Sequence, residues 1–70
     1  MRSYEDAIRH AHREGERFAI SQFVAAMLEG NGKDDGENIQ AFWDWFERLA
    51  DPPIKGVCYA AGQWIRRQME

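Results

Sequence analysis

The two histidines and the single cysteine are the side chains of this chain best suited to catalysis or metal binding. His10 and His12 lie two residues apart, and residues at that spacing on a helix point away from each other, so they cannot share a metal ion. Cys58 has no histidine near it in the sequence and lies on an apolar helix face, which predicts a buried, inert thiol. The sequence therefore predicts no catalytic residue, no metal site and no cofactor.

Residues 31–37 are rich in the oxygen-bearing side chains that calcium ions prefer. If the last glycine of this segment is aligned with the invariant glycine of a calcium-binding loop, Lys33 takes a ligand position. Phe42 then takes the position of the bidentate glutamate. Neither side chain can serve there, so the segment is predicted to be a turn. Asp34 or Asp35 would cap the helix that follows, with Glu37 as the third helical residue if Asp34 is the cap.

Arg9, Arg13 and Arg17 recur every four residues and form a ridge along one helix. Guanidinium groups on such a ridge can contact phosphates. Acidic residues interleave with these arginines, however, and no nucleic-acid-binding motif accompanies them. The net charge of −3 and the pI near 5.3 also argue against a general polyanion binder. A nucleic-acid-binding regulator that uses this ridge is therefore the second hypothesis for function.

Residues 39–50 hold two of the three tryptophans and two of the four phenylalanines, and the rest of the chain is organised around them. Trp45 falls at the edge of the apolar face of this helix, where a small protein has difficulty covering it. Tyr59 likewise lies off the main apolar stripe of the last helix. Tyrosine, tryptophan and arginine dominate binding hot spots. The predicted partner or dimer interface therefore contains Trp45, Tyr59, Arg9, Arg13 and Arg17.

Apolar periodicity predicts three helices, at residues 4–29, 36–50 and 52–69, and no strand. Ser3 can cap the first helix, and glycines at 30 and 32 end it. Gly15 lies on the apolar stripe, where with Ala11 it forms a notch for a closely packed helix, so we expect no break there. Asp51 and Pro52 suit the cap and the first turn of the third helix. Short loops favour antiparallel neighbours, which predicts an all-α, antiparallel three-helix bundle forming one domain over residues 1–70.

The predicted core draws on the apolar stripe of each helix. The stripe of the first helix contributes Ile8, Phe18, Phe23 and Met27, and is widened by Ile20, Val24 and Leu28. The second helix contributes Ile39, Phe42, Trp43, Phe46 and Leu49. The third contributes Ile54, Val57, Cys58, Ala61, Trp64 and Ile65. A chain of 70 residues buries only about 60% of its unfolded surface, and one cysteine excludes an internal disulfide. A first helix of about 39 Å would also overhang the shorter second one, which favours self-association.

These observations favour a small non-enzymatic protein that binds and regulates or inhibits a partner protein, as a homodimer. No apolar run reaches the length of a membrane span, and the acidic start of the chain has no signal-peptide character, so we expect a cytoplasmic protein. In size and type it is like the small accessory proteins that phages and other mobile elements use to inhibit host machinery. No motif carries a resemblance to a named family. A structural subunit of a larger assembly fits the sequence equally well, and the partner's identity stays open.

Overall fold

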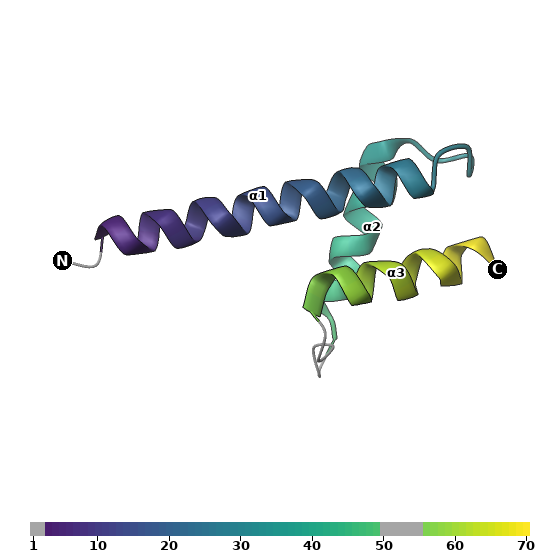
Figure 1. Ribbon diagram of the computed structural model, residues 1–70. Helices are drawn as coiled ribbons and strands as arrows, with labels where there is room; N and C mark the ends of the chain where they lie inside the picture. Colours follow the sequence, from purple (N-terminus) through teal and green to yellow (C-terminus); the bar gives the residue numbers. More distant parts are fainter. Residues whose placement is uncertain (1–2, 50–55) are drawn as a thin grey trace.

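The computed structural model of this protein describes residues 3–49 and 56–70, and the side chains of residues 13–49 and 56–70. It contains three helices, α1 (Ser3–Met27), α2 (Asp35–Glu47) and α3 (Gly56–Met69), which are shown in Figure 1. No strand occurs in the described ranges. The predicted all-α fold of three packed helices with a long first helix is confirmed.

Local backbone chemistry sets where the helices begin and end. α1 is continuous through Gly15, as predicted, and ends at Met27, just before Gly30 and Gly32 with φ values of 88° and 90°. A right-handed helix cannot continue through such a backbone conformation, which glycine adopts readily. At the start of α2, the Asp34 carboxylate accepts a hydrogen bond of 2.8 Å from the Glu37 amide, so Asp34 is the cap.

The predicted end of the second helix differs from the structure. α2 ends at Glu47, with Arg48 as its C-cap, three residues before the predicted end at residue 50. The described part of α3 begins at Gly56, which has a φ of 84°. The predicted cap at Asp51, the predicted start at Pro52 and the predicted core residue Ile54 lie outside the described residues.

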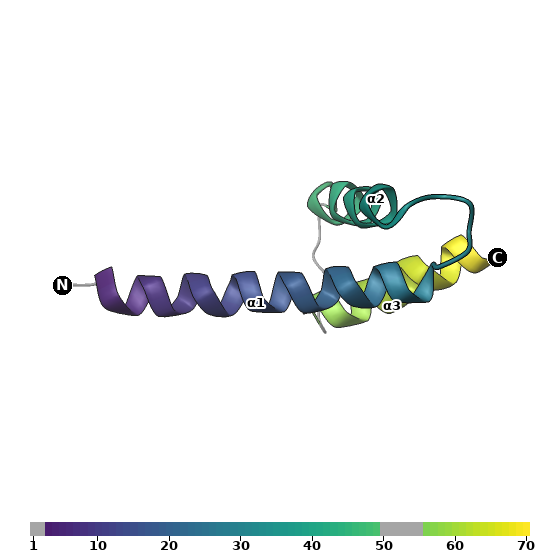
Figure 2. The same cartoon turned by 90° about the horizontal axis from the view of Figure 1, so that it is seen from above.

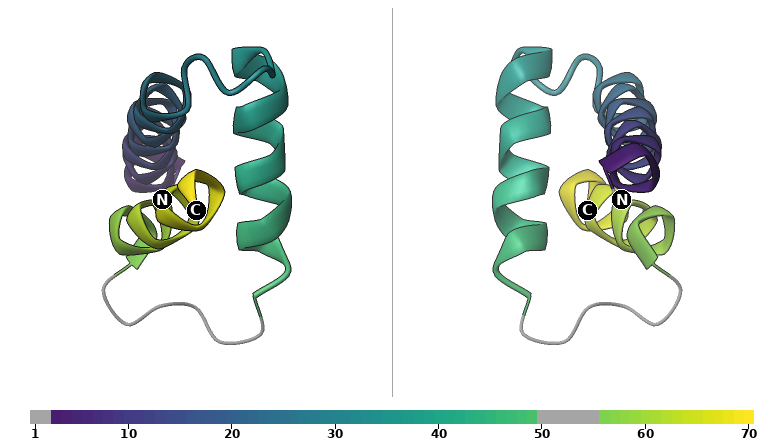
Figure 3. Two further views of the ribbon diagram at one scale, coloured as in Figure 1. Left: turned by 90° about the vertical axis from the view of Figure 1, so that its right-hand side faces the viewer. Right: turned by 90° about the vertical axis from the view of Figure 1, so that its left-hand side faces the viewer.

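The three helices form two layers. α1 and α3 lie side by side and run in the same direction, as the first and third helices of an up-down-up arrangement do, whereas α2 crosses both of them steeply (Figures 1 and 3). Viewed from above, α2 lies on one side of the α1 and α3 layer, and the first half of α1 extends beyond the other two helices (Figure 2). The opposite side of that layer carries no further element within the described ranges.

The core lies where α2 crosses α1 and α3. Its buried residues are Ile20, Val24 and Leu28 of α1, Phe42 and Trp43 of α2, and Ala61, Trp64 and Ile65 of α3. Ile39, Phe46 and Val57 are partly buried against it, and Leu49 is half-buried. Phe42 is fully buried at the centre, with its ring centroid 4.8 Å from that of Trp43 and 5.6 Å from that of Trp64. Aromatic packing of this kind supplies much of the core of so small a chain.

Four residues that were predicted to be core are exposed, and this part of the prediction is wrong. They are Phe18, Phe23 and Met27, at 67%, 46% and 45% exposure, and Cys58. α1 is apolar around most of its circumference after residue 17, but α2 and α3 cover only the side that carries Ile20, Val24 and Leu28. The stripe chosen from periodicity is therefore turned away from the core. Ile8, which belongs to the same stripe, lies outside the described side chains.

The loop between α1 and α2 is held by two asparagines. The Asn31 amide nitrogen donates to the Asn38 side-chain oxygen over 2.9 Å, and the Asn38 nitrogen donates back to the Asn31 oxygen over 3.3 Å. Asn38 is only 2% exposed, so this pairing satisfies a buried amide. The Asn31 oxygen also accepts from the Lys33 backbone, which leaves the segment organised as a turn.

Candidate protein-interaction surface

Two adjoining hollows lie along the exposed side of α3. The first, of about 300 Å³, lies between α2 and α3 and is lined by Trp45, Gln63, Arg66 and Arg67. The second, of about 360 Å³, is lined by Cys58, Tyr59, Gly62, Gln63 and Arg66. Because Gln63 and Arg66 border both hollows, they form one continuous surface. We call Trp45, Tyr59, Gln63, Arg66 and Arg67 the α3 surface.

Trp45 is the aromatic anchor of the α3 surface. Its ring centroid lies 6.0 Å from that of Phe42 and 6.5 Å from that of Trp64, so the core holds it on one side. It is nevertheless only half-buried, and the remaining part borders the hollow beside Arg67. The structure thus places Trp45 at the core edge, and an aromatic ring held in this way loses little conformational freedom on binding.

Arg66 and Arg67 occupy the last turn of α3, where their charges also favour the negative end of the helix dipole. Both are exposed, and neither takes part in an ion pair or hydrogen bond with the side chains that the structure describes. By sequence alone, their place in the last turn indicates only that they balance the helix end. Both arginines lie on the face of α3 that carries Tyr59. Gln63 follows Tyr59 by four residues, and Arg66 and Arg67 follow Gln63 by three and four, so this spacing is the sequence signal for them.

The predicted arginine ridge lies elsewhere and is partly engaged within the chain. The Arg17 guanidinium carbon lies 4.3 Å from the centroid of the Trp43 ring, and its Nη2 lies 3.8 Å from Oε1 of Glu47. Arg13 and Arg17 line a different hollow. Two acidic residues, Glu14 and Glu16, line it with them. The Arg9 side chain lies outside the described residues. The structure therefore brings Trp45 and Tyr59 together with Arg66 and Arg67, not with Arg13 and Arg17.

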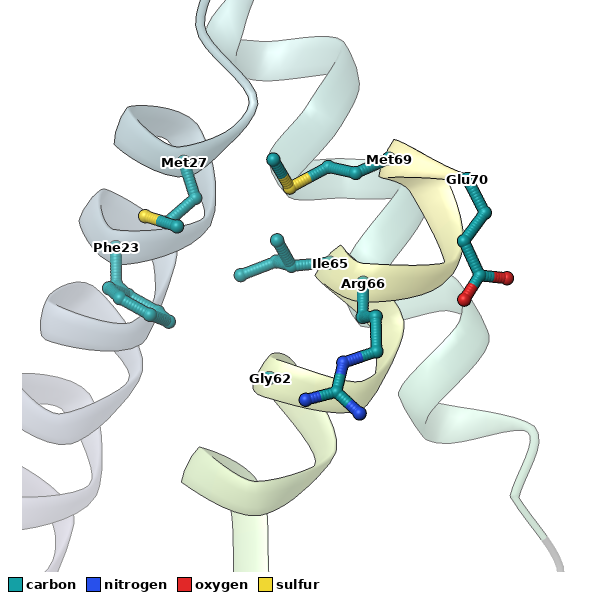
Figure 4. Close-up of a pocket in the computed structure, with 7 residues that line it drawn as sticks. All are labelled: Phe23, Met27, Gly62, Ile65, Arg66, Met69 and Glu70. Atoms are coloured by element: carbon teal, nitrogen blue, oxygen red, sulfur yellow. The ribbon is translucent and has the colours of Figure 1, made fainter.

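An apolar groove of about 400 Å³ runs between α1 and α3. Phe23 and Met27 of α1 face Ile65 and Met69 of α3 across it, and Arg66 lies at its margin (Figure 4). α2 lies behind these side chains in that view, so the groove opens on the uncovered side of the α1 and α3 layer. This groove could not be predicted from the apolar stripe of α1, because that stripe indicates that Phe23 and Met27 lie in the core.

Within residues 13–49 and 56–70, no group of three or more histidine, cysteine or acidic side chains comes together in a way that could hold a metal ion. The side chains of His10 and His12 are not among those described. None of the described helices is long and apolar enough to cross a membrane. Comparison of the chain with protein-family models, with curated proteins and with solved structures found no match.

Proposed function

We propose that this chain is a small non-enzymatic protein that binds a partner protein through the α3 surface and thereby regulates or inhibits it. The observation that carries the proposal is the position of Trp45, half-buried beside Arg66 and Arg67. Neither arginine has a carboxylate partner among the described side chains, so each can pair with a carboxylate of another molecule. Beside a fixed aromatic ring, such an arginine is a typical centre of a binding interface.

The chemistry of the α3 surface indicates what kind of segment it binds. Arg66 and Arg67 favour an acidic segment, although the chain as a whole carries a net charge of −3. The Trp45 ring and the two hollows, of about 300 and 360 Å³, favour an apolar side chain next to the acidic group. The proposed ligand is therefore a protein segment that combines a carboxylate with an adjacent apolar or aromatic residue.

We propose further that the chain acts as a homodimer, because a core of this size stabilises a monomer only marginally. Nucleic-acid binding by the Arg9, Arg13 and Arg17 ridge gains no support from the structure, since Arg17 is engaged by Trp43 and Glu47. Phosphate contacts would make affinity fall steeply as salt rises, so a gel-shift series at several salt concentrations tests that alternative.

The partner proposal is tested by affinity capture from a lysate of the native cells, using the unaltered chain and two charge-reversal variants. Arg67→Glu changes the α3 surface. Arg48→Glu makes the same charge change at an exposed position that lines none of the hollows described above. We expect one discrete protein to be captured by the unaltered chain and by Arg48→Glu, to be lost with Arg67→Glu, and to remain after nuclease treatment.

Circular dichroism of each variant checks that the helices are retained. Capture of the same proteins by all three chains would overturn the proposal. Capture that disappears after nuclease treatment would overturn it in favour of nucleic-acid binding.

A further inference from the structure

The uncovered side of the α1 and α3 layer exposes a face that is apolar except for Gln22. On α1, Gly15, Ala19, Gln22 and Ala26 lie opposite the buried Val24 and Leu28, with Phe18 at one margin and Phe23 at the other. The face continues into the groove where Met27 and Met69 meet, and Met69 is 65% exposed. Contiguous apolar surface of this kind marks an interaction site in soluble proteins.

We propose that a second copy of this chain covers this face, which we call the α1 face and define as Gly15, Phe18, Ala19, Gln22, Phe23, Ala26 and Met27 with the adjoining groove. The inference specifies the surface of the homodimer, and it rests on that part of the proposed function alone. It does not depend on partner binding by the α3 surface.

The exposed area of the chain is the first argument for a second copy. The accessible surface is 5644 Å². The scaling of surface with mass predicts about 4,500 Å² for a compact monomer of 8.2 kDa. The chain therefore exposes about 1,100 Å² more than a compact monomer of its mass. Each partner in a standard interface buries about 800 Å², so the excess is enough for one such interface. The radius of gyration, 13.8 Å against about 11 Å for a compact chain of this length, agrees with an uncovered extension.

The unsupported half of α1 is the second argument. The part of α1 that extends beyond α2 and α3 has no helix of the described chain beside it (Figures 1 and 2). Isolated helices of fewer than about 12 to 15 residues are marginal in water, because most helical stability in proteins comes from packing. A second α1 that lies along the α1 face and extends beyond it, along the first half of the helix, would supply that packing for both chains at once.

The charge and shape of the α1 face favour a copy of itself as occupant. Residues 18–27 of α1 carry no charged side chain, so this part of the face meets no like-charge repulsion when it is paired with itself around a two-fold axis. The charged residues that line the groove, Arg66 and Glu70, are of opposite sign. A Cβ atom added at Gly15 would contact nothing within 4 Å, so the notch that this residue opens is empty. Small residues at a helix contact allow the helix axes to approach closely.

The test is sedimentation equilibrium over a range of concentrations, combined with light scattering, on the purified full chain without any partner. Ala19→Glu puts a charge at the centre of the α1 face, and Met27→Glu puts one in the groove. Both positions are exposed in the monomer, so neither substitution disturbs the core. Lys33→Gln makes the same change of one negative unit at an exposed loop position and serves as the matched control.

We expect the unaltered chain and Lys33→Gln to be dimers, and the dimer dissociation constant of Ala19→Glu and Met27→Glu to rise at least tenfold. Near-ultraviolet circular dichroism of the buried tryptophans checks that the monomer core persists. A monomeric unaltered chain at 0.1 mM, or a dimer that neither glutamate weakens, would overturn the proposal. Arg67→Glu, which is expected to lose partner binding, should remain a dimer. The two proposals can therefore fail independently of each other.

Discussion

The indole nitrogen of Trp43 donates a hydrogen bond of 2.9 Å to the hydroxyl oxygen of Ser21, and the two residues are 22 positions apart in the sequence. This bond joins α2 to α1 at the point where the helices cross. Trp43 is buried, so its N–H group has no ready access to water. A buried donor of this kind is costly to leave without an acceptor.

Ser21→Ala should therefore lower the free energy of unfolding by about 1–2 kcal/mol, because it removes the acceptor and leaves the Trp43 donor unsatisfied. Urea unfolding followed by tryptophan fluorescence measures this. Ser21→Thr keeps the hydroxyl group, so its loss of unfolding free energy should be less than half of that caused by Ser21→Ala. Equal losses in the two variants would show that the hydrogen bond is not the cause.

The paired amides of Asn31 and Asn38 predict a coupling between the loop and α2. Asn31→Ala and Asn38→Ala should each destabilise the chain, with Asn38 the more costly because it is the buried member. In a double-mutant cycle, the interaction energy should be about 0.5–3 kcal/mol, as expected for residues that share hydrogen bonds. Additive effects of the two substitutions would contradict the pairing.

The opposite environments of Phe42 and Phe18 predict opposite outcomes for the same substitution. Phe42→Ala removes the centre of the core and should cost about 3–5 kcal/mol, enough to unfold most molecules of a chain with so small a core. Phe18→Ala should change the stability of the monomer in dilute solution by less than about 0.5 kcal/mol. Thermal unfolding by circular dichroism measures both.

A further consequence follows for Phe18→Ala as protein concentration rises. The unaltered chain should gain thermal stability with concentration, because dimerisation stabilises the folded state by mass action. The variant should gain less. If Phe18→Ala instead causes a large loss of stability that does not depend on concentration, Phe18 belongs to the monomer core.

Features that depend on neighbouring residues could be predicted from the sequence. The three helices, a cap at Asp34 or Asp35, the stop at Gly30 and Gly32, and the continuity of α1 through Gly15 all follow from local backbone and side-chain chemistry. The burial of Phe42 and Trp43 follows from the clear division of α2 into an apolar and a charged face. A helix with one apolar face has one side that it can bury.

The pairing of Asn38 with Asn31 and the meeting of Trp45 with Arg66 and Arg67 could not be predicted in the same way. The first depends on the path of the loop between α1 and α2, which the spacing of apolar residues does not specify. The second depends on the steep crossing of α2 over α3, which orients two elements distant in sequence. Nothing in the spacing of arginines along the chain distinguishes the last turn of α3 from the ridge on α1.

Local sequence chemistry therefore specifies three helices, where two of them begin or end, and the burial of Phe42 and Trp43. The side of α1 that faces the core depends instead on how the helices pack. α1 is apolar around most of its circumference after residue 17, so the apolar periodicity is compatible with burial of either of two sides. One side carries Phe18 and Phe23, and the other carries Val24 and Leu28. The crossing of α2 buried the second side. That choice left the first exposed, and it is the surface from which we infer the dimer.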